Sequence, residues 1–193
     1  MKRYFGKKVS TAVFISGRGS NLKNLIKFSR NKKSPIKIDL VFSNNRNAYG
    51  LSYAKIEKIN TLFINDKKFY ILEKKLLKIL KEKKIKFICL AGFMRILTNN
   101  FIKKFKGRII NIHPSLLPKY KGLNTHNRAI QNKDKYSGAT VHIVNEKLDS
   151  GRIILQKKVK ILRSDTVRSL EKKVLKIEHK IYPKAIIRLL TSF

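Results

Sequence analysis

Hydrophobic and polar positions divide this chain into short apolar runs and longer amphipathic segments. The apolar runs are rich in Val, Ile and Phe and are bounded by polar or turn-forming residues, which is typical of buried strands. We predict strands at residues 9–15, 36–42, 61–64, 87–90, 108–112, 139–144 and 153–160. The spacing of the early runs leaves room for helices between them.

Helical periodicity occurs in those intervals, where apolar residues recur at i, i+3 or i+4 and Lys and Glu lie on the other face. The segments with this pattern are 21–28, 48–59 and 69–83. A longer helix is predicted over residues 166–190, capped by Ser164 or Asp165. Because proline removes a backbone donor and its ring clashes with the preceding turn, Pro183 should kink or interrupt that helix.

Strands that alternate with helices predict an α/β, Rossmann-like fold with a mainly parallel, twisted sheet flanked by helices. A chain of 193 residues with 42% hydrophobic residues is long enough for one substantial core and short for two. It contains no internal repeat or low-complexity linker. We therefore expect a single domain over residues 1–193.

Composition favours a soluble, cytoplasmic protein. No apolar segment approaches the roughly 20 residues that span a bilayer. The lysine-rich start, residues 1–8, lacks the apolar core and cleavage site of a signal peptide. The single Cys89 cannot form an internal disulfide and lies in an apolar run, so we expect a buried, unreactive thiol.

The net charge of +35 would by itself point to nucleic acid or an anionic membrane surface. The lysines, however, are spread over nearly every predicted helix and loop instead of forming one stripe. Lys, Ile, Asn and Phe are abundant together, as expected of an AT-rich genome. We favour compositional drift over a dedicated nucleic-acid face, and expect no specific nucleic-acid or membrane partner. The charge would still attract anionic small molecules.

The segment Asn111-Ile112-His113-Pro114-Ser115-Leu116-Leu117-Pro118 carries the most specific chemical signal. If residues 108–112 form a strand, side chains at i and i+2 share a face, so Asn111 and His113 project into one site. The prolines then stop the strand. An amide donor beside an imidazole that titrates near neutral pH suits acyl transfer to an amine.

Two further segments follow predicted strands, and ligands of open α/β sheets bind at the carboxyl ends of strands. Residues 16–21 follow the first strand, and residues 92–97 follow the fourth. In the first, backbone N–H groups at Gly17 and Gly19, with the Ser20 hydroxyl, could hold a phosphate at a helix N-terminus. The alternative is a tight turn that needs glycine for steric reasons.

Asp149 lies in Lys147-Leu148-Asp149-Ser150-Gly151, which also reads as an ordinary turn. A functional Asp149 beside His113 would raise the pKa of the imidazole and stabilise its protonated form. For His126 and His142 a structural role is the better interpretation. No Cys or carboxylate stands at ligand spacing from a histidine, so we expect no metal site.

These residues together closely resemble the glycinamide ribonucleotide formyltransferases, folate-dependent enzymes of purine synthesis. The resemblance covers almost the whole chain in the right order. The matching stretches are residues 15–22, 91–97, 111–123, 146–151 and 178–183.

The resemblance implies transfer of a formyl group from 10-formyltetrahydrofolate, as cosubstrate, to the amine of N1-(5-phospho-D-ribosyl)glycinamide, here called the ribonucleotide. The amine would attack the formyl carbon directly, with Asn111, protonated His113 and Asp149 as the catalytic set. The residues implied in ribonucleotide binding are Gly17, Gly19, Ser20, Asn21 and Glu178. The residues implied in folate binding are Met94, Arg95, Ile96, Leu97 and Asn111, with 144–149 closing over the pterin pocket.

Some features depart from the family pattern. Arg18 stands where the family often has a smaller polar residue, but its side chain can point to solvent. The basic contact to the folate tail is expected within residues 66–69, where Lys67 or Lys68 could serve. The oligomeric state implied is a monomer or a homodimer.

Three other functions compete with this interpretation. A methionyl-tRNA formyltransferase would suit the basic surface but needs a C-terminal β domain, for which we expect no room after Phe193. A formyltetrahydrofolate deformylase would share Asn111, His113 and Asp149 but normally carries an N-terminal regulatory domain. A nucleic-acid-binding protein on the same fold would need a dense basic face with exposed aromatic residues.

Overall fold

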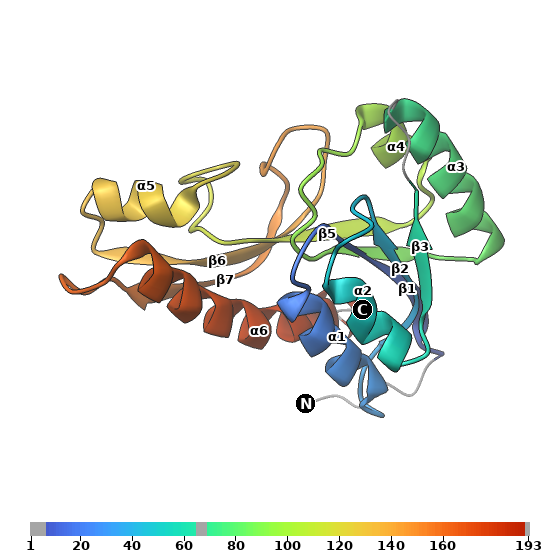
Figure 1. The fold of residues 1–193 in the computed structure, drawn as a ribbon, viewed down its shortest axis with the longest axis horizontal. Coiled ribbons are helices and arrows are strands. Elements are labelled where there is room, and N and C mark those ends of the chain that lie inside the picture. The colour runs from blue at the N-terminus through green and yellow to red at the C-terminus, as the bar shows by residue number, and fades with distance from the viewer. Residues whose placement is uncertain (1–6, 65–68, 192–193) are drawn as a thin grey trace. The chain divides into compact units, whose positions relative to one another are not determined.

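The computed structural model describes residues 7–64 and 69–191, and it has an α/β fold (Figure 1). Within those residues seven strands form a mixed, mostly parallel sheet in the order β3-β2-β1-β4-β5-β6-β7. The strands are β1 (Val9–Ile15), β2 (Ile36–Ser43), β3 (Asn60–Phe63), β4 (Phe87–Leu90), β5 (Arg108–His113), β6 (Tyr136–Ile143) and β7 (Ile153–Lys160). The helices are α1 (Ser20–Arg30), α2 (Gly50–Ile56), α3 (Phe69–Glu82), α4 (Asn99–Lys104), α5 (Thr125–Gln131) and α6 (Val167–Thr191). The predicted fold class and each predicted strand are confirmed.

Two helices were not predicted from the sequence, and both are short. α4 has 6 residues and α5 has 7, too few for an apolar stripe to repeat. α4 instead begins at a local capping signal, because the Thr98 side chain accepts a hydrogen bond from the Phe101 N–H.

α6 corrects two expectations about the C-terminal helix. It runs without interruption through Pro183, because the side chains around the proline, Tyr182, Ala185 and Ile186, are fully buried and their packing maintains the helix. The residue that caps the start of α6 is Thr166, and not Ser164 or Asp165 as predicted. Its Oγ1 accepts from the Ser169 N–H at 3.2 Å, and the Ser169 hydroxyl accepts from the Thr166 N–H at 3.0 Å.

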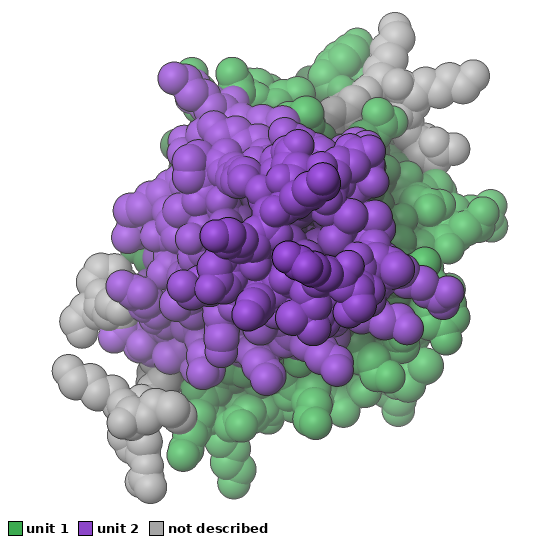
Figure 2. Space-filling view, turned by 90° about the vertical axis from the view of Figure 1, so that its left-hand side faces the viewer, with its two compact units in different colours: residues 1–110, 193 green, residues 111–192 purple. Residues whose placement is uncertain are grey.

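The chain groups into two compact units, one up to Ile110 and the other from Asn111 to Ser192 (Figure 2). No helix within the described residues is long and apolar enough to cross a bilayer.

In the first unit, β1 lies between β2 and β4 and is parallel to both. Its core includes an aromatic cluster centred on Phe14, whose ring centroid lies 5.0 Å from that of Phe42 and 5.5 Å from that of Phe93. Cys89 on β4 is fully buried, as predicted. Because β1 and β4 are parallel neighbours, the loops that follow them lie at the same edge of the sheet.

In the second unit, β6 and β7 form an antiparallel hairpin, α6 packs against both strands, and α5 packs against β6 (Figure 1). The pairing shifts between Val141, opposite Leu155, and His142, opposite Ile153. Ile154 is therefore an extra residue in β7, which makes this position a β-bulge. The hairpin carries His142 on β6 and Asp149 in its connecting loop.

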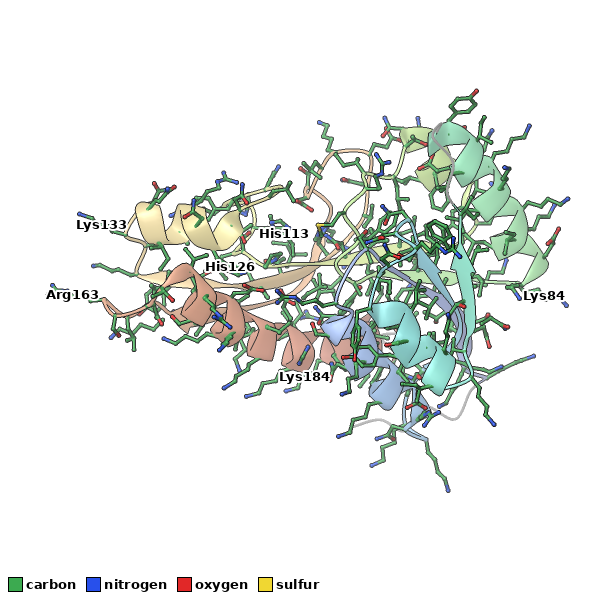
Figure 3. All side chains as sticks on the ribbon, in the orientation of Figure 1. Lys84, His113, His126, Lys133, Arg163 and Lys184 are labelled. Atoms are coloured by element: carbon green, nitrogen blue, oxygen red, sulfur yellow. The ribbon has the colours of Figure 1, made fainter. Side chains whose placement is uncertain are left out.

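Basic side chains project from many elements of the structure, as Figure 3 shows. The four basic residues labelled there, Lys84, Lys133, Arg163 and Lys184, are all exposed and belong to different parts of the chain. This distribution agrees with the expectation of dispersed charge.

Candidate active site

Three polar side chains of the second unit, Asn111, His113 and His142, meet around the carboxylate of Asp149. The Asn111 Nδ2 lies 3.5 Å from Asp149 Oδ1, and the His113 Nδ1 lies 3.4 Å from Asp149 Oδ2. The His142 Nε2 lies 3.5 Å from Asp149 Oδ1 and 3.4 Å from the Asn111 Nδ2. We call Asn111, His113, His142 and Asp149 the Asp149 cluster. The structure thus brings together the three residues expected to share a site and adds His142.

Asn111 and His113 reach the cluster because they are two residues apart on β5, where side chains at i and i+2 share a face. Asp149 reaches it through the β6–β7 hairpin. The Ile143 N–H donates to the Arg152 carbonyl at 2.9 Å, and Asp149 adopts a left-handed backbone conformation with φ of 45°. A Cβ on Gly151 would lie 1.8 Å from the Ile143 carbonyl oxygen, so this closure requires glycine.

The Asp149 carboxylate is held in its ionised form. The Gly122 N–H donates to its Oδ2 at 2.9 Å. Burial raises the pKa of Asp149, but the hydrogen bonds from His142 and Gly122 and the charges of both histidines outweigh burial and hold the pKa below its usual value. The cluster therefore contains a fixed negative charge.

His113, labelled in Figure 3, is 5% exposed, and each of its ring nitrogens faces a hydrogen-bond acceptor. Its Nε2 lies 2.8 Å from the Tyr120 carbonyl oxygen, which can only accept, so Nε2 carries a proton. Burial lowers the pKa of His113, and the Tyr120 carbonyl and the Asp149 carboxylate oppose that effect without reversing it. Asp149 acts on His113 in the expected direction, but the net pKa shift is downward.

His142 is the residue of the cluster that sequence reasoning assigned to structure. Its Nδ1 lies 2.9 Å from the Ile143 carbonyl oxygen and donates to it, and its Nε2 faces both the Asn111 amide and the Asp149 carboxylate. The signal that could have found it is the turn at Asp149-Ser150-Gly151, because a hairpin there places the preceding strand beside Asp149. His126 lies on α5, and burial lowers its pKa.

The first unit presents a second set of predicted residues, which we call the β1/β4 edge: residues 16–21 after β1 and 92–97 after β4. The two loops are joined at Ser16, whose N–H donates to the Gly92 carbonyl at 3.1 Å. Its hydroxyl accepts from the Met94 N–H at 2.8 Å and donates to Asn44 Oδ1 at 2.6 Å. These three bonds, one of the Ser16 backbone and two of its hydroxyl, fix the shape of the edge.

Gly19 and Gly17 differ in what their positions require. Gly19 has φ of 73°, and a Cβ there would lie 2.5 Å from the Gly50 Cα, so sterics alone demand glycine. A Cβ on Gly17 would meet nothing within 4 Å. Gly19 is the residue before α1, and no side chain caps the start of that helix. Backbone N–H groups of the first turn, which includes the buried Asn21, can therefore donate to a bound anion.

The other half of the edge carries exposed apolar side chains. Met94 is 63% exposed and Ile96 is 69% exposed, whereas Leu97 is 5% exposed and belongs to the core. Large apolar side chains left in water beside a polar loop are typical of a ligand-binding surface. Of the four residues predicted here, Met94 and Ile96 therefore expose apolar side chains that a flat ligand could cover.

Several other predicted residues lie elsewhere. Glu178 is buried, at 8% exposure, on α6 of the second unit. The predicted folate-tail contact at Lys67 or Lys68 lies outside the described residues. Within residues 7–64 and 69–191 no group of three or more His, Cys, Asp or Glu side chains is arranged to hold a metal ion.

Known proteins share this sequence and fold. A family model described as formyl transferase matches residues 9–186. The phosphoribosylglycinamide formyltransferase of Haemophilus influenzae is 43% identical over 178 residues, which make up 91% of this chain and 84% of that protein. The human trifunctional purine biosynthetic protein adenosine-3 is 44% identical over 183 residues, which make up 93% of this chain and 18% of that protein. The chain thus spans less than a fifth of the trifunctional relative.

Solved structures agree with these matches. The crystal structure of phosphoribosylglycinamide formyltransferase from Brucella melitensis matches with a TM-score of 0.90 and 41% identity, covering 95% of this chain and 96% of that one. The enzyme of the same name from Anaplasma phagocytophilum matches with a TM-score of 0.90 and 40% identity, covering 96% of this chain and 88% of that one. The chain belongs to the formyl transferase family and, within it, to the phosphoribosylglycinamide formyltransferases.

Proposed function

We propose that this protein transfers the formyl group of 10-formyltetrahydrofolate to the amine of N1-(5-phospho-D-ribosyl)glycinamide in purine (IMP) synthesis. The observation that carries the proposal is the Asp149 cluster, in which an amide donor, an imidazole and an ionised carboxylate converge within 3.5 Å. The near full-length matches to enzymes of that name support the choice of substrates.

In this proposal the amine nitrogen attacks the formyl carbon, which becomes tetrahedral with a negative oxygen. The Asn111 amide donates to that oxygen. Collapse of the intermediate breaks the bond to the folate nitrogen, which takes a proton, while the attacking amine loses one. Preorganised donors of this kind usually supply a large part of catalysis, and removing one costs about 3 kcal/mol.

His113 would act through Nδ1, because its Nε2–H already donates a hydrogen bond to the Tyr120 carbonyl. A protonated Nδ1 can donate to the developing oxyanion and pass its proton toward the folate nitrogen. Asp149 stabilises that imidazolium, since its carboxylate lies 3.4 Å from Nδ1. Burial makes the imidazolium costly, so this charge is best supported when the substrate's own developing negative charge is present.

Substrate binding is assigned to the groups predicted for it. Gly17, Gly19, Ser20 and Asn21 would hold the ribonucleotide phosphate at the start of α1, and Glu178 would bind its glycinamide part. Met94, Arg95, Ile96 and Leu97 would line the pterin pocket. The protein would work in the cytoplasm as a monomer or homodimer, without a metal and without a specific nucleic-acid partner.

The test is the absorbance change when the protein is mixed with a 10-formyl folate analogue, with and without the ribonucleotide. Deformylation that depends on the ribonucleotide is expected. Turnover of the analogue without the ribonucleotide would instead identify a deformylase. No turnover under either condition would overturn the proposal.

A further inference from the structure

The loop of residues 119–122 contacts two members of the Asp149 cluster, His113 and Asp149. The Tyr120 carbonyl accepts from His113 Nε2 at 2.8 Å, and two residues later the Gly122 N–H donates to Asp149 Oδ2 at 2.9 Å. One short stretch of backbone therefore contacts the imidazole and the carboxylate. The position of this backbone decides which imidazole nitrogen of His113 faces Asp149.

Tyr120 adopts a backbone conformation that residues other than glycine seldom adopt, with φ of 57°. The side chain of the same residue supplies the restraint that such a conformation requires. Its hydroxyl donates to Asp134 Oδ2 at 2.8 Å and accepts from the Asn132 Nδ2 at 2.7 Å. Both partners follow α5 directly.

The Tyr120 ring is held as well as its hydroxyl. The Arg128 guanidinium carbon lies 4.7 Å from the ring centroid, and the Lys119 Nζ lies 5.0 Å from it. Arg128 also donates to the Lys121 carbonyl at 2.8 Å, and Lys119 pairs with Asp134 at 2.6 Å. The side chain is thus pinned to α5 and the turn after it, which packs against β6.

We propose that Tyr120 is a positioning residue: its phenol, anchored by Asn132 and Asp134, holds its own carbonyl against His113 Nε2 and so keeps His113 Nδ1 directed at the Asp149 carboxylate. Tyr120 does not contact the reacting atoms in this scheme. It fixes the tautomer and orientation of an imidazole that does. The consequence for catalysis rests on the proposed function, whereas the consequence for the tautomer does not.

The direct test is Tyr120→Phe, which removes the hydroxyl and keeps the ring. We expect kcat to fall by between about tenfold and a hundredfold, the scale of loss produced by slight misplacement of a catalytic group. The KM for the ribonucleotide should stay within about twofold, because the β1/β4 edge is untouched. The ¹⁵N shifts of His113 should change from a single Nε2–H tautomer to a mixture.

The matched control is Tyr136→Phe. Tyr136 also lies in the second unit and also has a lysine over its ring, Lys158 at 4.8 Å, but it is 44% exposed on β6. This variant should keep the wild-type kcat and the wild-type His113 spectrum. An equal loss in both tyrosine variants would overturn the proposal, as would a single unchanged tautomer in Tyr120→Phe.

A second variant separates positioning from folding. Asn132→Ala removes one partner of the phenol and leaves Tyr120 itself in place, so it should shift the His113 tautomer in the same direction and lower kcat less. Should Tyr120→Phe fail to fold, an unchanged His113 spectrum in Asn132→Ala would overturn the proposal. If the wild-type protein transfers no formyl group, the spectra still decide the proposal about the tautomer.

Discussion

The Asp149 cluster and the β1/β4 edge place their polar and apolar groups in opposite ways. In the cluster the polar atoms are buried and contact one another, with His113 5% and His142 2% exposed. At the edge the large apolar side chains of Met94 and Ile96 are exposed, and the hydrogen bonds of the Ser16 backbone and hydroxyl maintain the shape. In the proposed function, the reacting groups are thus set before substrate arrives, whereas the binding surface acquires its partners only from the ligand.

Physical chemistry accounts for the difference. A buried polar group without a partner costs free energy, so groups that must be precise and dry are built as a network. A surface that gains affinity from burying apolar area must leave that area in water until the ligand covers it. The two regions should therefore respond differently to substitution.

The largest effect is expected from His113→Ala. Loss of the imidazole should lower kcat by roughly 10² to 10⁴, the usual contribution of a positioned acid or base. The affinity for the ribonucleotide should stay largely intact, because its phosphate is assigned to the β1/β4 edge. Kinetics together with isothermal titration checks this, and lost binding in the titration would sink the division of roles.

Gly19→Ala should give the next largest effect, and on binding instead of chemistry. The positive φ alone costs about 1–2 kcal/mol for a residue with a Cβ. If that cost must be met to form the phosphate-binding loop, the Kd for the ribonucleotide rises by about 5- to 30-fold. The kcat at saturation should stay near the wild-type value. Gly17→Ala is the matched comparison, because it keeps the backbone N–H assigned to the phosphate and its Cβ meets no protein atom within 4 Å, so it should weaken binding less.

Equal losses of ribonucleotide affinity in Gly17→Ala and Gly19→Ala would contradict the steric distinction between the two glycines. A fall in kcat at saturating substrate for Gly19→Ala would contradict the separation of binding from chemistry.

Ile96→Ser should change folate binding by only a few-fold. Its side chain is 69% exposed, so the free energy of unfolding should change by no more than about 0.5 kcal/mol. Leu97→Ala, one residue on and 5% exposed, should instead destabilise the protein by about 2–5 kcal/mol. Urea denaturation and titration with a folate analogue distinguish the two; a stability loss in Ile96→Ser would show that the side chain is structural.

The smallest effect concerns the dependence of stability on pH. The pKa of His113 is lower in the folded protein than the usual 6.5, so at mildly acidic pH the unfolded chain binds a proton that the folded protein does not. The free energy of unfolding should therefore fall as pH decreases from 6.5 toward the folded pKa, and His113→Gln should weaken that dependence.

Only part of the pH dependence should disappear, because burial also lowers the pKa values of His126 and His179. Denaturation of wild type and His113→Gln at pH 7.5 and pH 5.5 measures the difference. A steeper dependence in the variant would contradict the sign.

The predictable features of this molecule are those that depend on local periodicity. The strands followed from apolar runs, and the shared face of Asn111 and His113 followed from the period of two along β5. The capping of α6 by Thr166 was not found because several polar residues precede that helix. The continuity of α6 through Pro183 depends on the tertiary burial of its neighbours, which no local rule contains.

Three members of the candidate site, Asn111, His113 and Asp149, were predicted from the sequence, but the contacts that hold them were not. His142 and Tyr120 reach the cluster through a hairpin register and a loop anchored by α5, and both are contacts between distant parts of the second unit. The net lowering of the His113 pKa was not predicted. The sequence shows Asp149 as a candidate neighbour, which would raise that pKa, but it does not show how deeply His113 is buried.

The β-bulge at Ile154 bears on which insertions and deletions this chain can accept. His142 lies directly after the register shift, and Asp149 lies in the loop that the shifted pairing closes at Gly151. Deleting the extra residue would restore a regular ladder and exchange the faces of the residues on one side of it. Although residues 145–148 are exposed and look tolerant of length changes, the number of residues between His142 and Ile154 fixes two members of the cluster at once. We therefore expect natural length variation to fall outside this hairpin.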